Sequence, residues 1–519
     1  MRRSAVSSRT VIPGSHHARV AGICLLLAGV LAAVSAQAAD SDDKAFRRDF
    51  RRVFDALRGP PCGSALAAAD AIIEAPLFQE DLSKAERFGF LHALTRCAQD
   101  FDEYELLFRA ADLWAGIAPR EIMPQRFRLH YGGSAGSPAA SLEAFDVLLD
   151  LSPKYIRGLD ISSWYRLSDA ADRVDSTGDR KLAMYEQYWR IGKAPDAPHD
   201  DDHLRLGHAR LLLARGRAEE AGKLLSTVIE IHALARIRSD RLFDPLRSDP
   251  AFEARLDLVA GAERDLAYSL ATMEEKPRTI SAVTQHISKL MVLHRLDEAL
   301  ALADRTLAQN SADPKAFADS DEATRWLLDR RAAVLNALGR YAEATDSLLE
   351  AANQLEHRRS NISNMINLAS HLVRDGRPAE AMRLLVGIRE PSRYGQSLIE
   401  AIRSCAAVQL GNDAERLRSL EYLKAHEADS ESALSLALLC SNDLDGAAAL
   451  MIRRLGSQRT SGDALLALQE RPGRGLELQG FRKLMQDRLA ALRAREDVRA
   501  AATAIGRIEL LPVHLGGSY

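Results

Sequence analysis

Apolar side chains recur every three or four residues through most of this chain, and the alternation typical of strands is scarce. The segment from Asp329 to Asn353 shows the pattern clearly, as two apolar stripes on either side of Gly339. The first stripe begins just before this segment, and the members of the two stripes are Leu328, Ala332, Leu335 and Leu338, then Tyr341, Ala344, Leu348 and Ala351. Such a pattern predicts a helix–turn–helix hairpin, in which Gly339 accommodates the turn and the alanines let the helices approach closely.

The same turn recurs at intervals of 31 to 45 residues, apart from one interval of 78. Its clearest copies are GRAEEA at 216–221, GRYAEA at 339–344 and GRPAEA at 376–381. Weaker copies begin at Gly178, His294, Gly411 and Asn442. Most copies have a small residue seven positions before the turn residue, namely Ala171, Ala209, Ala332, Ala369, Ser404 and Ser435. The predicted fold class is therefore all-α, built from stacked helical hairpins.

A Gly and an Ala five positions apart, a small residue seven positions before the Gly, and a period near 34 residues resemble the tetratricopeptide repeat. The resemblance covers roughly Ser162 to Leu455 and implies an α-solenoid with a concave groove that holds a protein or peptide partner. In this family the first helix of each hairpin lines the groove. Alignment on the turns places six residues there: Thr284, Ser288, Asp329, Asn336, Ser370 and Arg374. Asp329 and Ala333 stand where some family members carry the Lys and Asn that clamp a partner's terminal carboxylate, so a receptor for chaperone tails is not expected.

Two segments resemble closing caps. The segment from Arg241 to Leu256, RLFDPLRSDPAFEARL, is similar to the one that closes many bacterial tetratricopeptide arrays, and we expect its Phe243, Leu246 and Phe252 to be buried. The stretch Gly480–Gly506 is amphipathic and helical in pattern, like a second cap. The predicted organisation begins with a signal peptide at 1–38 and an N-terminal helical region at 39–160. A first array with its closing segment follows at 161–260, then a second array at 261–456 and a C-terminal cap at 457–519.

The first 38 residues resemble a cleavable export signal. Four arginines and no acidic residue precede the apolar run Val20–Val34. The sequence Ala36-Gln37-Ala38 then supplies the small residues that a signal peptidase needs for cleavage before Ala39. The alternative, an uncleaved anchor, is disfavoured because the run is shorter than the ~20 residues that span a bilayer. Removing the four arginines leaves 65 basic against 72 acidic residues, a net charge of −7. We therefore expect a bacterial periplasmic protein that has no membrane span after cleavage and no affinity for nucleic acid.

Export would place the cysteines in an oxidising compartment, where disulfides persist. Cys62 precedes one predicted helix and Cys97 ends another, so an antiparallel packing of the two helices predicts a Cys62–Cys97 disulfide. Cys405 and Cys440 fall on the first helices of successive repeats, about four positions out of register. We expect those two to be buried free thiols.

Candidate catalytic and metal-binding motifs are incomplete. The sequence PHDDDH at 198–203 could bind a divalent metal, but its acidic residues also suit the start of a helix, which we favour. The glycine-rich stretch Gly132–Gly136 lacks the Lys-Ser/Thr ending of a phosphate loop, and His426-Glu427 is not followed by the second His of a zinc-protease motif. No cofactor or metal is therefore expected. The predicted function is a non-enzymatic periplasmic scaffold for a protein or peptide of the cell envelope; the alternative is an envelope enzyme whose active site the sequence does not reveal.

Overall fold

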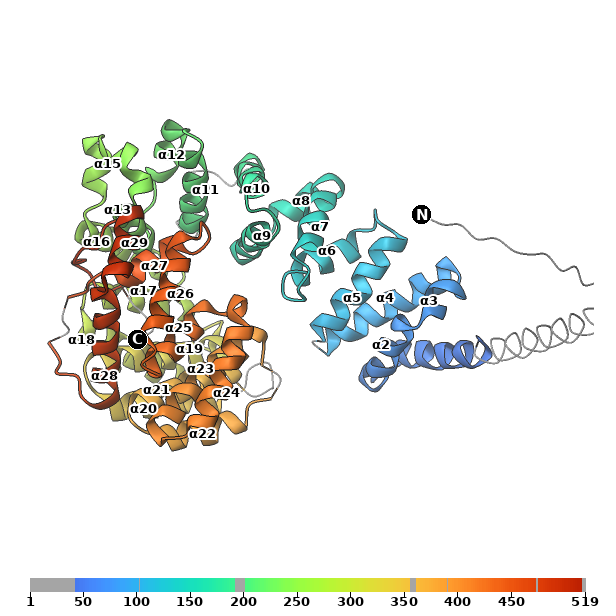
Figure 1. The fold of residues 1–519 in the computed structure, drawn as a ribbon. Helices are drawn as coiled ribbons and strands as arrows, with labels where there is room; N and C mark the ends of the chain where they lie inside the picture. Colours follow the sequence, from blue (N-terminus) through green and yellow to red (C-terminus); the bar gives the residue numbers. More distant parts are fainter. Residues whose placement is uncertain are drawn as a thin grey trace, which may run out of the picture. The chain divides into compact units, whose positions relative to one another are not determined.

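The computed structural model describes residues 43–101, 103–191, 201–354, 361–389, 391–472 and 475–515. The predicted signal peptide and its cleavage site lie outside these residues. Contacts divide the chain into two compact units, 1–192 and 193–519 (Figure 1). The predicted borders near 160 and 260 fall within these two units. Among the described residues, no helix is both long and apolar enough to cross a membrane.

The N-terminal unit is a succession of short antiparallel helices. A helix at 43–58 is followed by η1 (Cys62–Ala65), α2 (Leu66–Glu74), α3 (Pro76–Glu80), α4 (Lys84–Asp100), α5 (Tyr104–Ile117), α6 (Ile122–Tyr131), α7 (Pro138–Leu151), α8 (Pro153–Arg157), α9 (Ile161–Val174) and α10 (Asp179–Arg190). Ser83 and Glu86 form a capping box that starts α4, where the Ser83 side chain accepts the Glu86 N–H and the Glu86 carboxylate accepts the Ser83 N–H. The apolar core gathers phenylalanines from three segments, with Phe50 and Phe90 stacked at 5.1 Å and Phe78 edge-on to Phe90.

The C-terminal unit continues the hairpins through the rest of the chain. Its first part contains α11 (Asp202–Ala214), α12 (Ala218–Leu225), α13 (Ile231–Ser239), η3 (Arg241–Phe243), α14 (Asp244–Arg247), α15 (Pro250–Arg255), α16 (Leu258–Glu275), α17 (Ile280–Val292) and α18 (Leu296–Ala312). Then follow α19 (Ser320–Ala337), α20 (Tyr341–Asn353), α21 (Ile362–Arg374), α22 (Pro378–Val386), α23 (Arg393–Leu410), α24 (Asp413–Ala425), η4 (Glu427–Asp429), α25 (Glu431–Cys440), α26 (Leu444–Gly456), α27 (Ser461–Leu468), α28 (Gly480–Ala494) and α29 (Glu496–Ile505). The all-α prediction is confirmed.

The repeated turns share one backbone geometry. The turn residue adopts a left-handed conformation, with φ between 58° and 77° at Gly216, His294, Gly339, Gly376, Gly411 and Asn442. The N–H of the next residue donates to a carbonyl five positions earlier; Arg340 N–H, for example, donates to Leu335 O at 2.9 Å. This is the Schellman arrangement that ends a helix and satisfies its last carbonyls. The same end therefore recurs in hairpin after hairpin, including the two copies without glycine.

Small residues hold the paired helices close together. Ala332, seven positions before its turn, and Ala344, five after it, are both buried, and the equivalent residues of the 216 and 376 copies are also buried. The copy at Gly178 departs from this pattern, because α9 ends four residues before the glycine and Ala183 is exposed. That weak copy therefore forms a longer and different turn.

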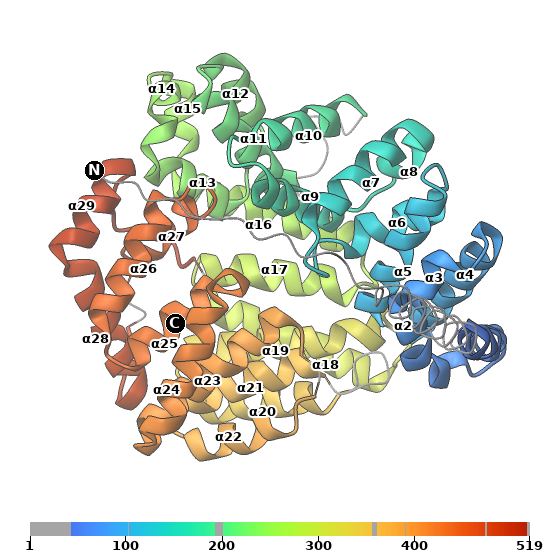
Figure 2. The ribbon, with the colours of Figure 1, turned by 45° about the vertical axis from the view of Figure 1, so that its right-hand side comes forward.

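The C-terminal segment packs on the start of its own unit. Figures 1 and 2 show α27 beside the green helix α13, and the two helices contact each other directly. Arg507 N–H donates to Ser239 O at 2.8 Å, and the Arg507 side chain pairs with Asp244 at 2.6 Å. Phe243, Leu246 and Phe252 of the closing segment are buried, as expected. The two predicted caps therefore lie together and close the C-terminal unit on itself.

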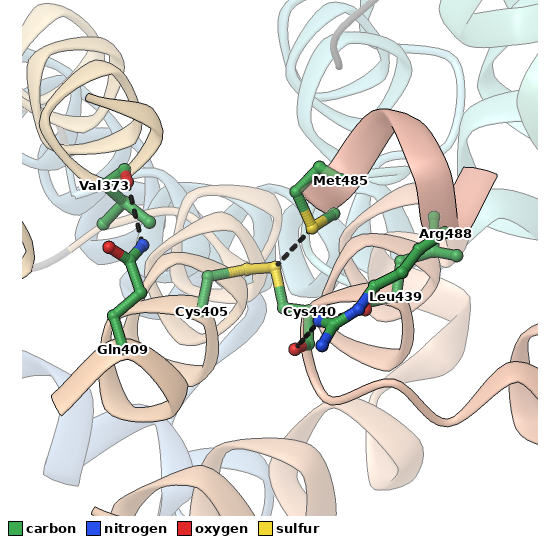
Figure 3. Close-up of a disulfide and its surroundings, with 7 residues drawn as sticks. All are labelled: Val373, Cys405, Gln409, Leu439, Cys440, Met485 and Arg488. Carbon is green, nitrogen blue, oxygen red and sulfur yellow. Dashed lines mark hydrogen bonds between the residues drawn. A yellow bond between two sulfur atoms is a disulfide. The ribbon is translucent and has the colours of Figure 1, made fainter. Parts of the chain in front are cut away.

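Disulfides occur in both units. One joins Cys62 and Cys97, the pair expected from the sequence, with their Cα atoms 6.0 Å apart. A second joins Cys405 and Cys440, with Cα atoms 5.1 Å apart, at the contact of α23, α25 and α28 (Figure 3). The expectation of two free thiols is wrong. Relative to their turns, the two cysteines are four positions out of register, which is about 6 Å along a helix. Because their Cα atoms are nevertheless 5.1 Å apart, α23 and α25 must be displaced along their axes by about this distance.

Candidate partner-binding surface

The six residues predicted to line the groove lie in pairs on three successive first helices. Thr284 and Ser288 are on α17, Asp329 and Asn336 on α19, and the remaining two, Ser370 and Arg374, on α21. All six are half-buried. The Thr284 hydroxyl donates to Ile280 O and the Ser288 hydroxyl to Thr284 O, both at 2.9 Å. These two hydroxyls are thus bonded within their own helix.

Asp329 connects neighbouring repeats. Its carboxylate accepts a hydrogen bond from Asn367 Nδ2 of α21 at 2.9 Å. Burial raises the pKa of Asp329, although the Asn367 hydrogen bond and the charges of Arg330 and Arg374 act in the opposite direction. The charge of Arg374, another of the six candidates, therefore acts on Asp329.

Asn336 contacts a residue that the sequence analysis did not identify. Its Oδ1 accepts a hydrogen bond from Arg482 Nη2 of α28 at 3.3 Å. The Arg482 guanidinium also lies 4.1 Å from the centre of the Tyr341 ring and 3.9 Å from the Asp375 carboxylate. Arg482 is 146 residues from Asn336 in sequence, so the repeat pattern could not have placed it there.

His371 is a second residue that the sequence analysis missed. It lies on α21 at 0% exposure, and its Nε2 is 2.9 Å from Thr345 Oγ1 of α20. Burial lowers its pKa to about 4, and the positive charges of Arg374 and Arg482 contribute. Arg374, the last residue of α21, and Arg482 of α28 therefore both act on His371. We call Arg330, Arg374 and Arg482 the arginine cluster.

The acidic motif before α11 has a structural role. The Asp201 carboxylate pairs with Arg205 Nε at 2.9 Å, and both side chains are buried. Asp202 Oδ2 accepts the backbone N–H groups of Ile229 and Glu230, each at 2.8 Å. Residues 198–200 of the motif lie outside the described residues. The described part of the chain contains no group of three or more His, Cys, Asp or Glu side chains that could hold a metal ion. Asp201 stands at the start of α11, as the helix-start interpretation expects, but the two carboxylates are buried rather than solvated, and the Asp201 side chain makes no capping hydrogen bond.

No family model and no curated protein matches the chain. Solved structures do resemble it. The crystal structure of yeast Tom70 is 13% identical over 90% of this chain and 99% of that one, with a TM-score of 0.29. The APC/C hetero-tetramer Cut9-Hcn1 is 14% identical over 83% and 98%, with a TM-score of 0.22, and the P58(IPK) TPR domain is 13% identical over 72% and 99%, with a TM-score of 0.17.

The hairpins are of the tetratricopeptide kind. Because identities and TM-scores are low, this description rests on the chain's own features. These are the paired antiparallel helices, the left-handed turn residue, and the buried small residues at fixed distances on either side of it.

Proposed function

We propose that this chain is an exported, non-enzymatic scaffold that holds an acidic segment of a cell-envelope protein against α19 and α21. The observation that carries the proposal is the arginine cluster, which draws Arg330 and Arg374 from the successive first helices α19 and α21 and Arg482 from α28. The field of its arginines, Arg374 and Arg482 among them, helps to hold the buried His371 neutral. An acidic partner segment complements such a surface.

Two disulfides support the exported location. Both connect buried or half-buried cysteines 35 residues apart, and such bridges persist in oxidising compartments rather than in the cytosol. Amino-terminal sequencing of the exported chain tests this part of the proposal. We expect it to begin at Ala39; a chain that retains Val20–Val34 would establish an uncleaved anchor instead.

Two carboxylates with strongly lowered pKa values, Asp175 and Glu230, fit a scaffold better than the alternative of an enzyme. Backbone N–H groups, that of Arg180 foremost, lower the pKa of Asp175 to about 2 at a turn. Against the effect of burial, His232 and His203 lower the pKa of Glu230 to about 2 at the start of α13. An enzyme would bring such groups together in one pocket, whereas these two belong to different units and each serves a local contact.

Crosslinking of the full chain to an envelope extract tests the binding surface. We expect acidic partner peptides crosslinked near α19 and α21, and their loss in an Arg374→Glu variant. Arg383→Glu is the matched control, because Arg383 is exposed on the second helix of the same hairpin. Equal capture by both variants, or crosslinks confined to other helices, would contradict the proposed surface.

A further inference from the structure

A pocket of about 520 Å³ lies in the N-terminal unit, whereas the repeat surface discussed above belongs to the C-terminal unit. Its apolar part includes Phe54, Leu57 and Phe101, and the Cys62–Cys97 disulfide lies beside them. The volume falls within the range of ~300–1,000 Å³ found for small-molecule sites. The pocket can therefore accommodate a compact apolar body.

The disulfide fixes the walls of this pocket. It ties the turn at 59–62 to α4, whose residues 92, 93, 96 and 97 line the pocket from one face of the helix. The opposite wall comes from the helix at 43–58. Because a covalent bond joins the turn to α4, the pocket exists before any ligand enters it, which reduces the entropic cost of binding.

The charged residues at the pocket favour an anion. Arg58 and Arg96 both line it and are exposed, and within the described part of the chain neither makes an ion pair with a carboxylate. The Arg58 guanidinium lies 5.6 Å from the centre of the Phe54 ring, which holds a cation directly over an aromatic wall. Asp100 is the one carboxylate among the lining residues, so the two arginines leave an excess of positive charge.

We propose that this pocket binds a small aromatic organic anion, with its ring against the apolar wall that Phe54, Leu57 and Phe101 form and its single carboxylate at Arg58 and Arg96. Aromatic side chains provide stacking surfaces for a flat ring, and arginine pairs with carboxylates through parallel hydrogen bonds. The site is separate from the proposed partner surface, so either can fail without the other.

Calorimetric titration of the full chain tests the site with two matched probes, 1-naphthoate and its neutral isostere 1-naphthamide. We expect naphthoate to bind and naphthamide to bind at least about tenfold more weakly, since it lacks the charge. Arg96→Gln should weaken naphthoate binding by about tenfold or more. Ala93→Leu should abolish it by filling the pocket, whose wall includes Ala93. Arg48→Gln should leave it unchanged, because Arg48 is exposed on the same 43–58 helix but does not line the pocket.

Three outcomes would overturn the proposal. The first is no binding of naphthoate to a chain whose circular dichroism shows it to be folded. The second is equal affinity for the acid and the amide, which would show that the arginines do not contribute. The third is tighter binding of a peptide ending in phenylalanine than of naphthoate, which would assign the pocket to a partner protein's chain end. Unchanged thermal unfolding of Arg96→Gln shows that its effect is on binding.

Discussion

His371 is a neutral imidazole within the repeat stack. Its pKa, lowered to about 4 by burial and by nearby arginines, lies below the ordinary value near 6.5. The folded chain therefore binds fewer protons than the unfolded chain between these pH values. His371 thus stabilises the fold fully above pH 6.5, and this stabilisation is lost as the pH falls through 6.5 to about 4.

Replacing His371 should flatten this pH dependence. The shift corresponds to about 3 kcal/mol of unfolding free energy, from ~1.4 kcal/mol per pKa unit. We expect the unfolding free energy of His371→Gln, measured with urea at steps from pH 7 to pH 4, to lack this pH-dependent contribution. His426→Gln is the control, because His426 is exposed and should retain the wild-type slope. An unchanged slope in His371→Gln would contradict the assignment.

Burial of polar residues was the least predictable property at the residue scale. The small residues beside each turn follow a local spacing, so Ala332 and Ala344 could be placed from the sequence. Glu400, at 1% exposure, accepts hydrogen bonds from Ser419 of the next helix and from Gln396 and Arg403 of its own. A partner on another helix is not visible in a pattern that runs along one helix.

Six of the helical hairpins in the C-terminal unit have a left-handed residue at the turn. Gly376 has a φ of 75° and open space where a Cβ would lie, so an added methyl group meets no atom. The cost of Gly376→Ala is then the backbone conformation alone, about 1 kcal/mol. Asn442 has the same conformation with a φ of 58°. Asn442→Gly should remove that strain and leave stability unchanged or slightly raised.

The two substitutions form a matched pair for thermal unfolding. We expect Gly376→Ala to lower the melting temperature of the C-terminal unit and Asn442→Gly to leave it unchanged or raise it. A fall of equal size in both variants would show that side-chain contacts, rather than backbone conformation, govern these turns.

The Cys405–Cys440 disulfide shows why contacts between repeats resist prediction. The turn pattern placed both cysteines on successive parallel helices, correctly, but the stagger of α23 against α25 depends on the connection between them. That connection includes the short helix η4, and α25 has 10 residues against 18 in α23. In Figure 3, Met485 of α28 lies over the disulfide, and Arg488 donates to Leu439 O at 3.0 Å.

Removing this disulfide should destabilise the C-terminal unit. A bridge between residues 35 apart contributes up to about 4 kcal/mol in the chain-entropy model. We expect the double variant Cys405→Ser and Cys440→Ser to lose most of this in urea unfolding. Met485→Leu, which keeps the apolar cover, should cost under about 1.5 kcal/mol. Equal stability of wild type and double variant would show that helix packing alone holds α23 and α25 together.

At the scale of the whole chain, the repeats were predictable and their closure was not. A helical period and a recurring turn are local properties, so the solenoid could be identified from spacing. The return of 506–515 to α13 joins residues more than 260 positions apart, as in the Arg507–Asp244 pair. The candidate surface shared this limit, because Arg482 of α28 contacts Asn336, 146 residues earlier in the chain. Asp329, Asn336 and Arg374 interact with residues of other helices. The hydroxyls of Thr284 and Ser288, in contrast, bond within α17.

Apolar burial rather than ion pairing should hold the C-terminal unit closed. Leu511, Val513 and Leu515 are at most 2% exposed, and truncating a buried leucine typically costs ~2–5 kcal/mol. The Arg507–Asp244 pair is 30% and 42% exposed, and such pairs contribute ~0–1 kcal/mol. We therefore expect Leu511→Ala to raise amide hydrogen exchange in α13 and α27 sharply, and Arg507→Gln to change it little. The opposite ranking would show that the salt bridge, and not the buried tail, keeps the two ends of the unit together.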